Sequence, residues 1–356
     1  MSVSRRHRLV AELSASASDC ILISNQVDVR WLTGFTGSNG ALLLTGDRAE
    51  LITDGRYTTQ AAQEAQSVGV QIESGDAFNA AIKRLETANS DRLFVQKDTI
   101  SANSAVMIGN SLSGFEIVDV GPVLSVMRAG KSEKEVNLIR RALSITEQVF
   151  SEIIPLIKEG ISENDLAAEI DYRQRLHGAS SSSFETIVAF GENSALPHAQ
   201  PGARTLVSGS PVLLDFGCVV EGYASDMTRM VYFGNPTADF QRAYSAVHTA
   251  FLRSVDSIHS GMSGQEADSV ARQVLQAEGY GRMFTHSLGH GVGLDIHEWP
   301  SLSSRNSAPL PEKCVVTIEP GVYLPSAFGI RIENMVYLTN TGAESLNQLP
   351  TELIVV

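Results

Sequence analysis

The sequence predicts two domains, an α/β domain followed by an α+β domain in which a helix-helix-hairpin unit occurs twice. The first prediction rests on strand-like segments that alternate with helical patterns before residue 129. The second rests on two six-residue segments that resemble each other, residues 160–165 and 261–266, each with helical patterns before and after it. A chain of 356 residues agrees with this division.

The first domain contains six short segments rich in apolar and β-branched residues, which favour strands. Helical patterns lie between some of them, at residues 56–66 and 76–86. This alternation predicts a central sheet with helices packed on it. The strand segments are CILIS (20–24), ALLLTG (41–46), AELITD (49–54), VQIES (70–74), RLFVQK (92–97) and FEIVDV (115–120).

The character of the chain changes after residue 128. Ala129 and Gly130 interrupt the preceding pattern, and Ser132 followed by Glu135 forms a candidate capping box for a new helix. We therefore expect one domain over residues 1–128 and a second over residues 129–356.

The second domain repeats the plan αα-ββ, and each copy ends in a hairpin with two acidic residues. The first hairpin carries Asp215 and Asp226, and the second carries Glu319 and Glu333. Each pair flanks its turn almost symmetrically, and directly opposed residues of an antiparallel pair share a face. A pseudo-twofold arrangement would then bring the two acid pairs face to face.

Carboxylates in apolar segments require a paired charge or a metal when they are buried. The four acids, together with His290 in HSLGHGVGLDIHE, balance about two divalent cations. Oxygen-rich ligation with one imidazole favours Mn²⁺, with Co²⁺ and Zn²⁺ as alternatives. The sequence therefore predicts a two-metal site and a hydrolase.

The histidines between residues 286 and 297 follow the spacing H-x₃-H-x₆-H, which differs from the HExxH helix of thermolysin-type zinc sites. Gly289, Gly291 and Gly293 argue against a regular helix here and suggest backbone that packs close to a ligand. His198 lies on a predicted loop between prolines, where a lone histidine is more often solvated than functional.

Composition excludes several classes of partner. The net charge of -13 argues against nucleic acid or an anionic membrane as the main partner. No apolar run is long enough to span a membrane, and the N-terminus resembles an amphipathic helix more than a signal peptide. Cys20, Cys218 and Cys314 are widely separated and are expected to be core residues, so we expect a cytoplasmic protein.

The second domain resembles the pita-bread metallopeptidases, the family of methionine aminopeptidase, aminopeptidase P and prolidase. All of the family's metal-ligand positions are filled. The resemblance implies a pita-bread fold with two metals, in which Asp215 binds one metal and His290 and Glu319 belong to the other. It also implies that Asp226 and Glu333 bridge the two metals.

The resemblance covers about residues 130–350 and extends to the substrate site. It matches the family's substrate-site histidines to His198, His286 and His297. It also matches Arg331, two residues before a bridging acid, to an arginine near the metals.

In the first domain, WLTGFTGSNGALLL followed by LITDGRY resembles the N-terminal domain of aminopeptidase P-like enzymes. The combined resemblance implies a two-metal Xaa-Pro aminopeptidase, which releases the N-terminal residue ahead of proline. Hydroxide formed at the metals would attack the carbonyl carbon, Glu319 would accept the proton of the water, and His297 would stabilise the oxyanion.

Three alternatives remain open. The first is an Xaa-Pro dipeptidase, or prolidase, which uses the same metals. The second is a binding protein that keeps the pita-bread fold without catalysis, and the third is creatinase-like chemistry, although the full set of ligands argues against both. The expected partner is a peptide with proline in second position, and the family implies a homodimer or homotetramer.

Overall fold

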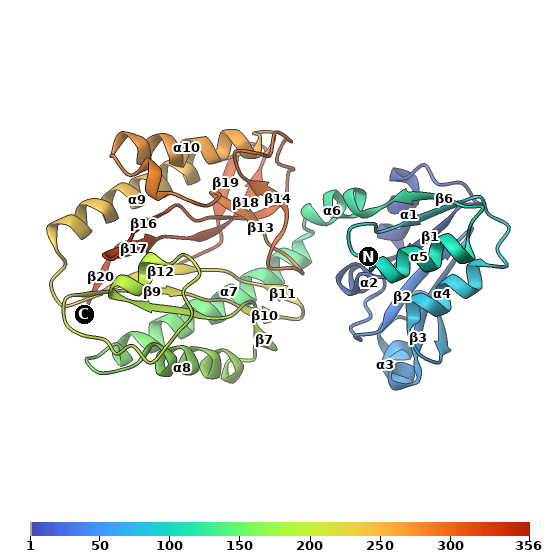
Figure 1. The fold of residues 1–356 in the computed structure, drawn as a ribbon, viewed down its shortest axis with the longest axis horizontal. Helices are drawn as coiled ribbons and strands as arrows, with labels where there is room; N and C mark the ends of the chain where they lie inside the picture. Colours follow the sequence, from blue (N-terminus) through green and yellow to red (C-terminus); the bar gives the residue numbers. More distant parts are fainter. Residues whose placement is uncertain (1) are drawn as a thin grey trace. The chain divides into compact units, whose positions relative to one another are not determined.

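Six strands of the N-terminal unit form one mixed sheet in the order β4-β3-β2-β1-β5-β6 (Figure 1). The strands are β1 (Cys20–Ile23), β2 (Gly40–Thr45), β3 (Arg48–Asp54), β4 (Gly69–Glu73), β5 (Arg92–Val95) and β6 (Glu116–Asp119). β1–β2 and β2–β3 pair antiparallel, whereas the other neighbours are parallel. All six predicted segments form strands, so the predicted α/β class is confirmed.

Six helices lie within residues 2–129, and those between β1 and β5 pack on the sheet. The six are α1 (Ser2–Glu12), α2 (Gln26–Thr33), α3 (Thr58–Glu64), α4 (Ala77–Leu85), α5 (Ala102–Ser111) and α6 (Gly121–Ala129), with a 3₁₀ turn at Gly55–Tyr57. Asp76 caps α4 by accepting a hydrogen bond from Asn79 N at 2.9 Å. Buried side chains of α4, such as Phe78 and Ile82, form a core with Leu43 of the sheet.

The computed structural model describes residues 2–356 and divides into two units, Met1–Met127 and Arg128–Val356. The first long helix of the second unit is α7 (Glu133–Ile153), which begins after Ser132. The backbone N–H of Ser132 donates to Glu135 Oε2 at 2.9 Å, which completes the capping box expected from the sequence.

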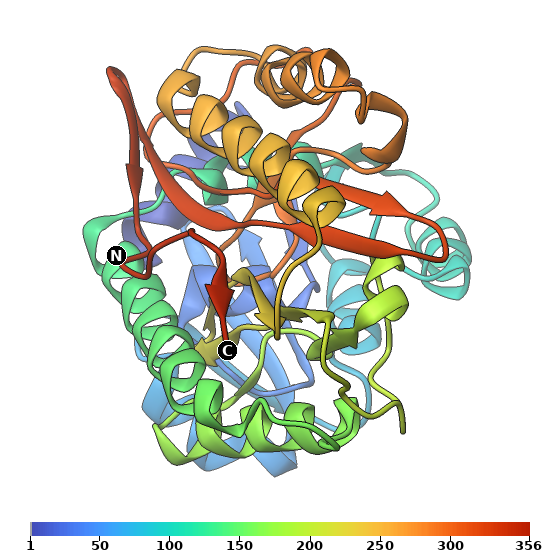
Figure 2. The same cartoon turned by 90° about the vertical axis from the view of Figure 1, so that its left-hand side faces the viewer.

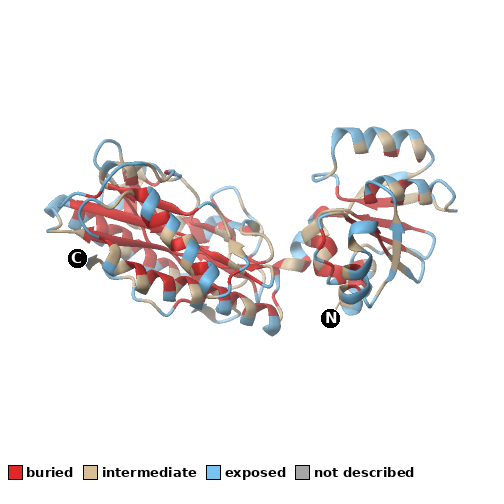
Figure 3. Cartoon of the chain, turned by 90° about the horizontal axis from the view of Figure 1, so that it is seen from below, coloured by how far each residue is buried: buried red, intermediate tan, exposed pale blue. Residues whose placement is uncertain are grey.

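In the second unit the strands lie between two helix pairs (Figures 1 and 2). The pairs are α7 with α8 (Glu163–Leu176), and α9 (Ala238–Ser257) with α10 (Gly264–Ala277). One core forms around Ile139 and Ile170 of the first pair, and another around Val247 and Leu275 of the second. Buried residues follow the strands and the inner helix faces, whereas the outer faces are exposed (Figure 3).

The strands of this unit form two larger sheets, in the orders β20-β12-β9-β8 and β14-β13-β15-β18-β19, and two small ones, β11-β10-β7 and β16-β17. The first larger sheet and the three-stranded sheet contain β7 (Ser181–Ser182), β8 (Ile187–Phe190), β9 (Ser210–Asp215), β10 (Cys218–Val220), β11 (Tyr223–Ala224), β12 (Thr228–Phe233) and β20 (Ile354–Val355). The others contain β13 (Gly289–Gly291), β14 (Glu298–Leu302), β15 (Val315–Ile318), β16 (Gly321–Leu324), β17 (Phe328–Arg331), β18 (Asn334–Thr339) and β19 (Gly342–Ser345).

The internal repeat has the same backbone geometry in both halves. Gly160 N donates to Leu206 O at 2.9 Å, and the equivalent Gly261 N donates to Leu310 O at 2.8 Å. Each copy of the motif also supplies the serine that caps the following helix, Ser162 for α8 and Ser263 for α10. The predicted αα-ββ repeat is therefore confirmed.

Two further predictions concern the whole chain. Cys20, Cys218 and Cys314 are free and buried, as expected for small core residues. Over residues 2–356, the helices are too short or too polar to cross a membrane.

Candidate metal centre

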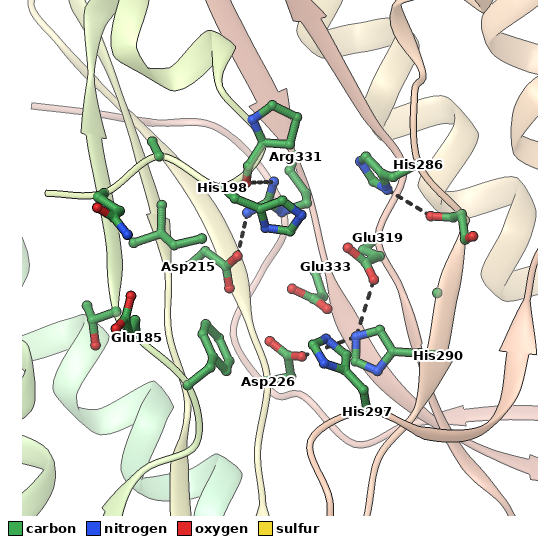
Figure 4. Close-up of a pocket in the computed structure, with 18 of the residues that line it drawn as sticks. Glu185, His198, Asp215, Asp226, His286, His290, His297, Glu319, Arg331 and Glu333 are labelled. Atoms are coloured by element: carbon green, nitrogen blue, oxygen red, sulfur yellow. Dashed lines mark hydrogen bonds and ion pairs between the residues drawn. The ribbon is translucent and has the colours of Figure 1, made fainter. Parts of the chain in front are cut away.

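One cavity of about 480 Å³ in the second unit collects the residues that the sequence assigns to the site (Figure 4). It is lined by Asp215, Asp226, Glu319, Glu333, His198, His286, His290, His297 and Arg331. Segments more than one hundred residues apart thus contribute side chains to a single cavity.

In the first hairpin the two acidic residues do not lie directly opposite each other. β9 and β12 pair Asp215 with Thr228, and in this register Asp226 falls opposite Gly217. Asp226 is therefore offset by two residues from the position opposite Asp215, but this spacing keeps both acids on one face, and both line the cavity as expected from their near-symmetric placement. The chain leaves one sheet for another at Gly217, where a Cβ atom would lie 1.8 Å from Ser225 O.

In the second hairpin the two acidic residues do lie opposite each other. β15 and β18 pair Ile318 with Asn334, and the β16–β17 hairpin continues in the same register. Glu319 and Glu333 therefore face each other in the short gap between the two paired segments. Both carboxylates lie just outside regular strands.

His290 presents one nitrogen to the acids. Its Nδ1 lies 3.2 Å from Gly291 O, so the proton is on Nδ1 and the Nε2 lone pair is free. Nε2 lies 3.6 Å from Asp226 Oδ2 and 3.4 Å from Glu319 Oε1. Ligand atoms of Asp226, His290 and Glu333 lie within 4.8 Å of one another. A lone pair directed at carboxylate oxygens is favourable when a cation lies between them.

The electrostatics of the acids also fit a cation. Burial, together with Glu333, Asp215 and Glu319, raises the pKa of Asp226 well above its ordinary value. Burial raises the pKa of Glu333, and burial raises the pKa of Glu319 to about 8 despite Arg331. A divalent ion would offset both the burial and the mutual repulsion of these groups. The donor set therefore fits divalent metal.

Asp215 is held from one side by Arg331. Arg331, only 4% exposed, donates through Nη2 to Asp215 Oδ2. The other oxygen, Oδ1, is buried and has no hydrogen-bond partner within residues 2–356. Asp215 therefore keeps one oxygen for a metal.

Two hydroxyl residues that the sequence did not point to join this network. Arg331 also donates to Tyr323 OH at 2.6 Å and to Thr228 Oγ1 at 3.1 Å. Thr228 in turn donates to Glu333 Oε2 at 2.7 Å. Thr228 lies two residues after Asp226, and this alternation is the one signal in the sequence that could have identified it.

His286 is bound within the protein at both nitrogens. Nδ1 lies 2.8 Å from Ser287 O and therefore carries the proton, while Nε2 lies 3.0 Å from Tyr323 OH. Burial and the charge of Arg331 lower the pKa of His286 to about 4, so the ring is neutral and Nε2 accepts from the tyrosine. His286 therefore offers the cavity a ring edge instead of an N–H group.

His297 packs edge-on against His290, with ring centroids 4.3 Å apart. Burial and neighbouring His198 lower the pKa of His297, so it is a neutral imidazole. His198 enters from the loop that follows the 3₁₀ turn at Gly191–Ala195. Both histidines line the cavity without joining the cluster of Asp226, His290 and Glu333.

The glycines on either side of His290 allow close contact between neighbouring strands. A Cβ atom on Gly289 would lie 2.0 Å from Thr317 O, and one on Gly291 would lie 2.6 Å from Glu298 O. These glycines therefore allow neighbouring strands to approach β13, while Gly289 also lines the cavity, so the expected approach of backbone to a ligand stays a prediction.

Comparisons with known proteins agree with this geometry. The model for metallopeptidase family M24 matches residues 137–340, and the model for the creatinase/prolidase N-terminal domain matches residues 5–129. The chain is 38% identical over 337 residues to an uncharacterized peptidase of Bacillus subtilis, covering 95% of this chain and 96% of the relative. It is 32% identical over 351 residues to an Xaa-Pro dipeptidase of Pyrococcus furiosus, covering 98% and 99%.

Solved structures give the same picture. An Xaa-Pro dipeptidase from Bacillus anthracis matches with a TM-score of 0.95 at 34% identity, covering the whole of both chains. An X-Pro aminopeptidase from Thermotoga maritima matches with a TM-score of 0.88 at 36% identity, covering 95% of this chain and 97% of the other.

Proposed function

The chain belongs to metallopeptidase family M24, and from this premise we propose that it hydrolyses Xaa-Pro dipeptides. The observation that carries the proposal is the convergence of four carboxylates and His290 on one cavity, with the His290 lone pair facing the acids. Such a donor set suits metal-assisted hydrolysis of an amide.

The dipeptidase is preferred to the aminopeptidase that the sequence favoured. The Pyrococcus furiosus relative and the Bacillus anthracis structure, both Xaa-Pro dipeptidases, match over essentially the full chain. The segments GFTGSNG and LITDGRY lie within residues 5–129, which match an N-terminal domain shared by creatinases and prolidases. These segments therefore do not distinguish the two activities, and the resemblance to aminopeptidase P loses its main support.

An Xaa-Pro aminopeptidase is the second candidate, because the Thermotoga maritima X-Pro aminopeptidase is 36% identical over most of both chains. Both activities cleave the Xaa-Pro bond, and they differ in whether the substrate peptide continues after proline. The homodimer or homotetramer and the cytoplasmic location remain predictions.

The proposed ligands are Asp215, Asp226, His290, Glu319 and Glu333, which would hold two divalent ions, with Mn²⁺ favoured by the oxygen-rich set. Asp226 and Glu333, whose ligand atoms lie close to that of His290, are the two acids that would be shared between the ions. When bound, the ions lower the pKa of water and polarise the carbonyl group. Arg331 fixes Asp215 in the orientation that leaves Oδ1 free.

Residues of the chain are proposed to have separate roles in the reaction. Glu319 accepts the proton of the attacking water and passes it to the proline nitrogen as the C–N bond breaks. His297 donates its N–H to the oxygen that becomes negative in the transition state. The Xaa-Pro bond has no N–H, so recognition depends on the shape of the cavity wall near His198 and His286.

A substrate panel tests the proposal. With Mn²⁺ supplied, we expect hydrolysis of Xaa-Pro dipeptides, slower or no hydrolysis of Xaa-Pro-Yaa, and none of Xaa-Ala-Yaa. Amino acids released from Ala-Pro, Ala-Pro-Ala and Ala-Ala-Ala would be quantified at matched concentrations. If the tripeptide with proline is the better substrate, the aminopeptidase replaces the dipeptidase, and if neither proline peptide is cleaved, both are rejected.

A further inference from the structure

One wall of the cavity is a loop, residues 191–202, that carries His198. It begins with the 3₁₀ turn at Gly191–Ala195, and residues 197–201 all line the cavity. Residues 197–201 are therefore the longest run of consecutive residues among those that line the cavity.

Both ends of the loop are bound by one buried carboxylate, Glu163. Glu163 is the first residue of α8 and is only 1% exposed. Its Oε1 accepts from Phe190 N at 2.8 Å and from Asn193 Nδ2 at 2.9 Å. Its Oε2 accepts from Gly202 N at 3.0 Å. Glu163 thus links the two ends of the loop, which we call its neck, through hydrogen bonds to one side chain.

The middle of the loop is attached to the site itself. Ser194 Oγ accepts from Gly329 N at 2.8 Å, and Pro197 O accepts from Arg331 Nη1 at 3.2 Å. Because Arg331 also binds Asp215, the loop shares one hydrogen-bond network with the candidate metal ligands. A change at the neck of the loop is therefore transmitted to the wall around His198.

The other half of the repeat indicates what the carboxylate is for. Gly264 occupies the position of Glu163 at the start of α10. Glu163 N donates to Arg204 O at 3.0 Å, and Gly264 N donates to Ala308 O at 3.4 Å. The helix start forms in both halves, so it does not require a side chain. The carboxylate therefore serves the loop of the first half.

Three N–H donors and the helix N-terminus suit a negative charge. A glutamine at this position keeps one acceptor oxygen but places an NH₂ group against N–H groups that also donate. That arrangement leaves a buried donor unsatisfied, which is unfavourable.

We propose that Glu163 is a positioning residue that holds the loop of residues 191–202, and through it His198, against the substrate. The proposal rests on the function proposed above, because its kinetic effect requires an Xaa-Pro substrate. Glu163 acts through the loop and does not contact the metals or the reacting bond.

Kinetics provide the first test. Glu163→Gln is expected to lower kcat/KM for Ala-Pro by about 10- to 100-fold, since small displacements of a positioning group have effects of this size. Metal content should not change. The matched control is Asp165→Asn, an exposed acid on the same helix that contacts Ser162 Oγ, with an expected change below about twofold.

A double-mutant cycle separates positioning from general destabilisation. In a His198→Ala background, Glu163→Gln should lower kcat/KM by less than about threefold further, because the residue through which it acts is absent. If the two losses multiply, Glu163 does not act through His198 and the proposal is overturned.

Hydrogen exchange tests the loop without any substrate. In Glu163→Gln the backbone amides of Phe190 and Gly202 should exchange faster than in the unaltered protein. In Asp165→Asn the exchange rates of the same two amides should not change. Asn193→Ala, which removes one donor, is the second variant if Glu163→Gln does not fold. Unchanged exchange overturns the anchoring whatever the substrate. If these amides exchange faster in Glu163→Gln but the unaltered protein cleaves no Xaa-Pro peptide, the proposed anchoring of the loop is supported and only the proposed function is rejected.

Discussion

Asp226→Asn is expected to lower Xaa-Pro hydrolysis below about 1% of the original rate, because a bridging carboxylate holds both metals of the proposed pair. The substitution keeps the size of the side chain but removes the charge beside His290 and Glu333. The measurement is kcat for Ala-Pro at saturating Mn²⁺, together with metal bound per chain, which should fall as well.

The fold of this variant should survive. Burial and the neighbouring acids raise the pKa of Asp226, so its ionised form is unfavourable in the metal-free protein. Metal-free Asp226→Asn is therefore expected to be at least as stable to thermal unfolding as the metal-free original, and to gain less stability from Mn²⁺. A variant that retains several per cent of the activity and full metal content would contradict the bridging role.

His297→Ala is expected to lower kcat by about two to three decades, the usual effect of removing one donor to an oxyanion. His297 lines the cavity and packs against the His290 ring, but it lies outside the cluster of ligand atoms. Metal content should therefore remain unchanged while turnover falls.

His259→Ala is the matched control, because His259 is exposed and its Nδ1 contacts only the neighbouring Ser260 O in the hydrogen bonds described. Its kcat should equal that of the original protein. If His297→Ala loses metal, the residue supports the ligands and does not donate to the oxyanion. If kcat does not change at all, His297 has no part in the reaction.

The architecture follows from local signals in the sequence. Apolar segments such as residues 20–24 form the sheet of the first unit because they are short, β-branched and bounded by helical patterns. The repeated serine of the two motifs forms the same helix start in each half, because N-capping depends on neighbouring residues alone. Signals of this kind need no tertiary information.

The details of the site depend on tertiary contacts, which the sequence does not display. Asp215 lies six residues before Glu221 and Asp226 four residues after Gly222, and the strands on both sides of Gly217 keep one register, but the sequence does not show that the chain passes from one sheet to another at Gly217. Tyr323 carries no charge, and its importance depends on Arg331 and His286 reaching the same hydroxyl. Such convergence becomes visible only when the strands are placed in space.

Glu163 illustrates the same limit. It belongs to the recurring motif, but the atoms it binds lie 27 to 39 positions further along the chain. The motif therefore predicts that a helix begins at Glu163, but it does not predict that Glu163 binds the loop of residues 191–202.

We propose that divalent metal, bound by Asp215, Asp226, His290, Glu319 and Glu333, enables the chain to hydrolyse the Xaa-Pro bond. The most direct test is to strip the protein with a chelator and titrate Mn²⁺ while measuring both hydrolysis of Ala-Pro and metal bound per chain. We expect no hydrolysis without metal and a rate that levels off at about two bound ions per chain. Full hydrolysis by protein shown to be metal-free would contradict it.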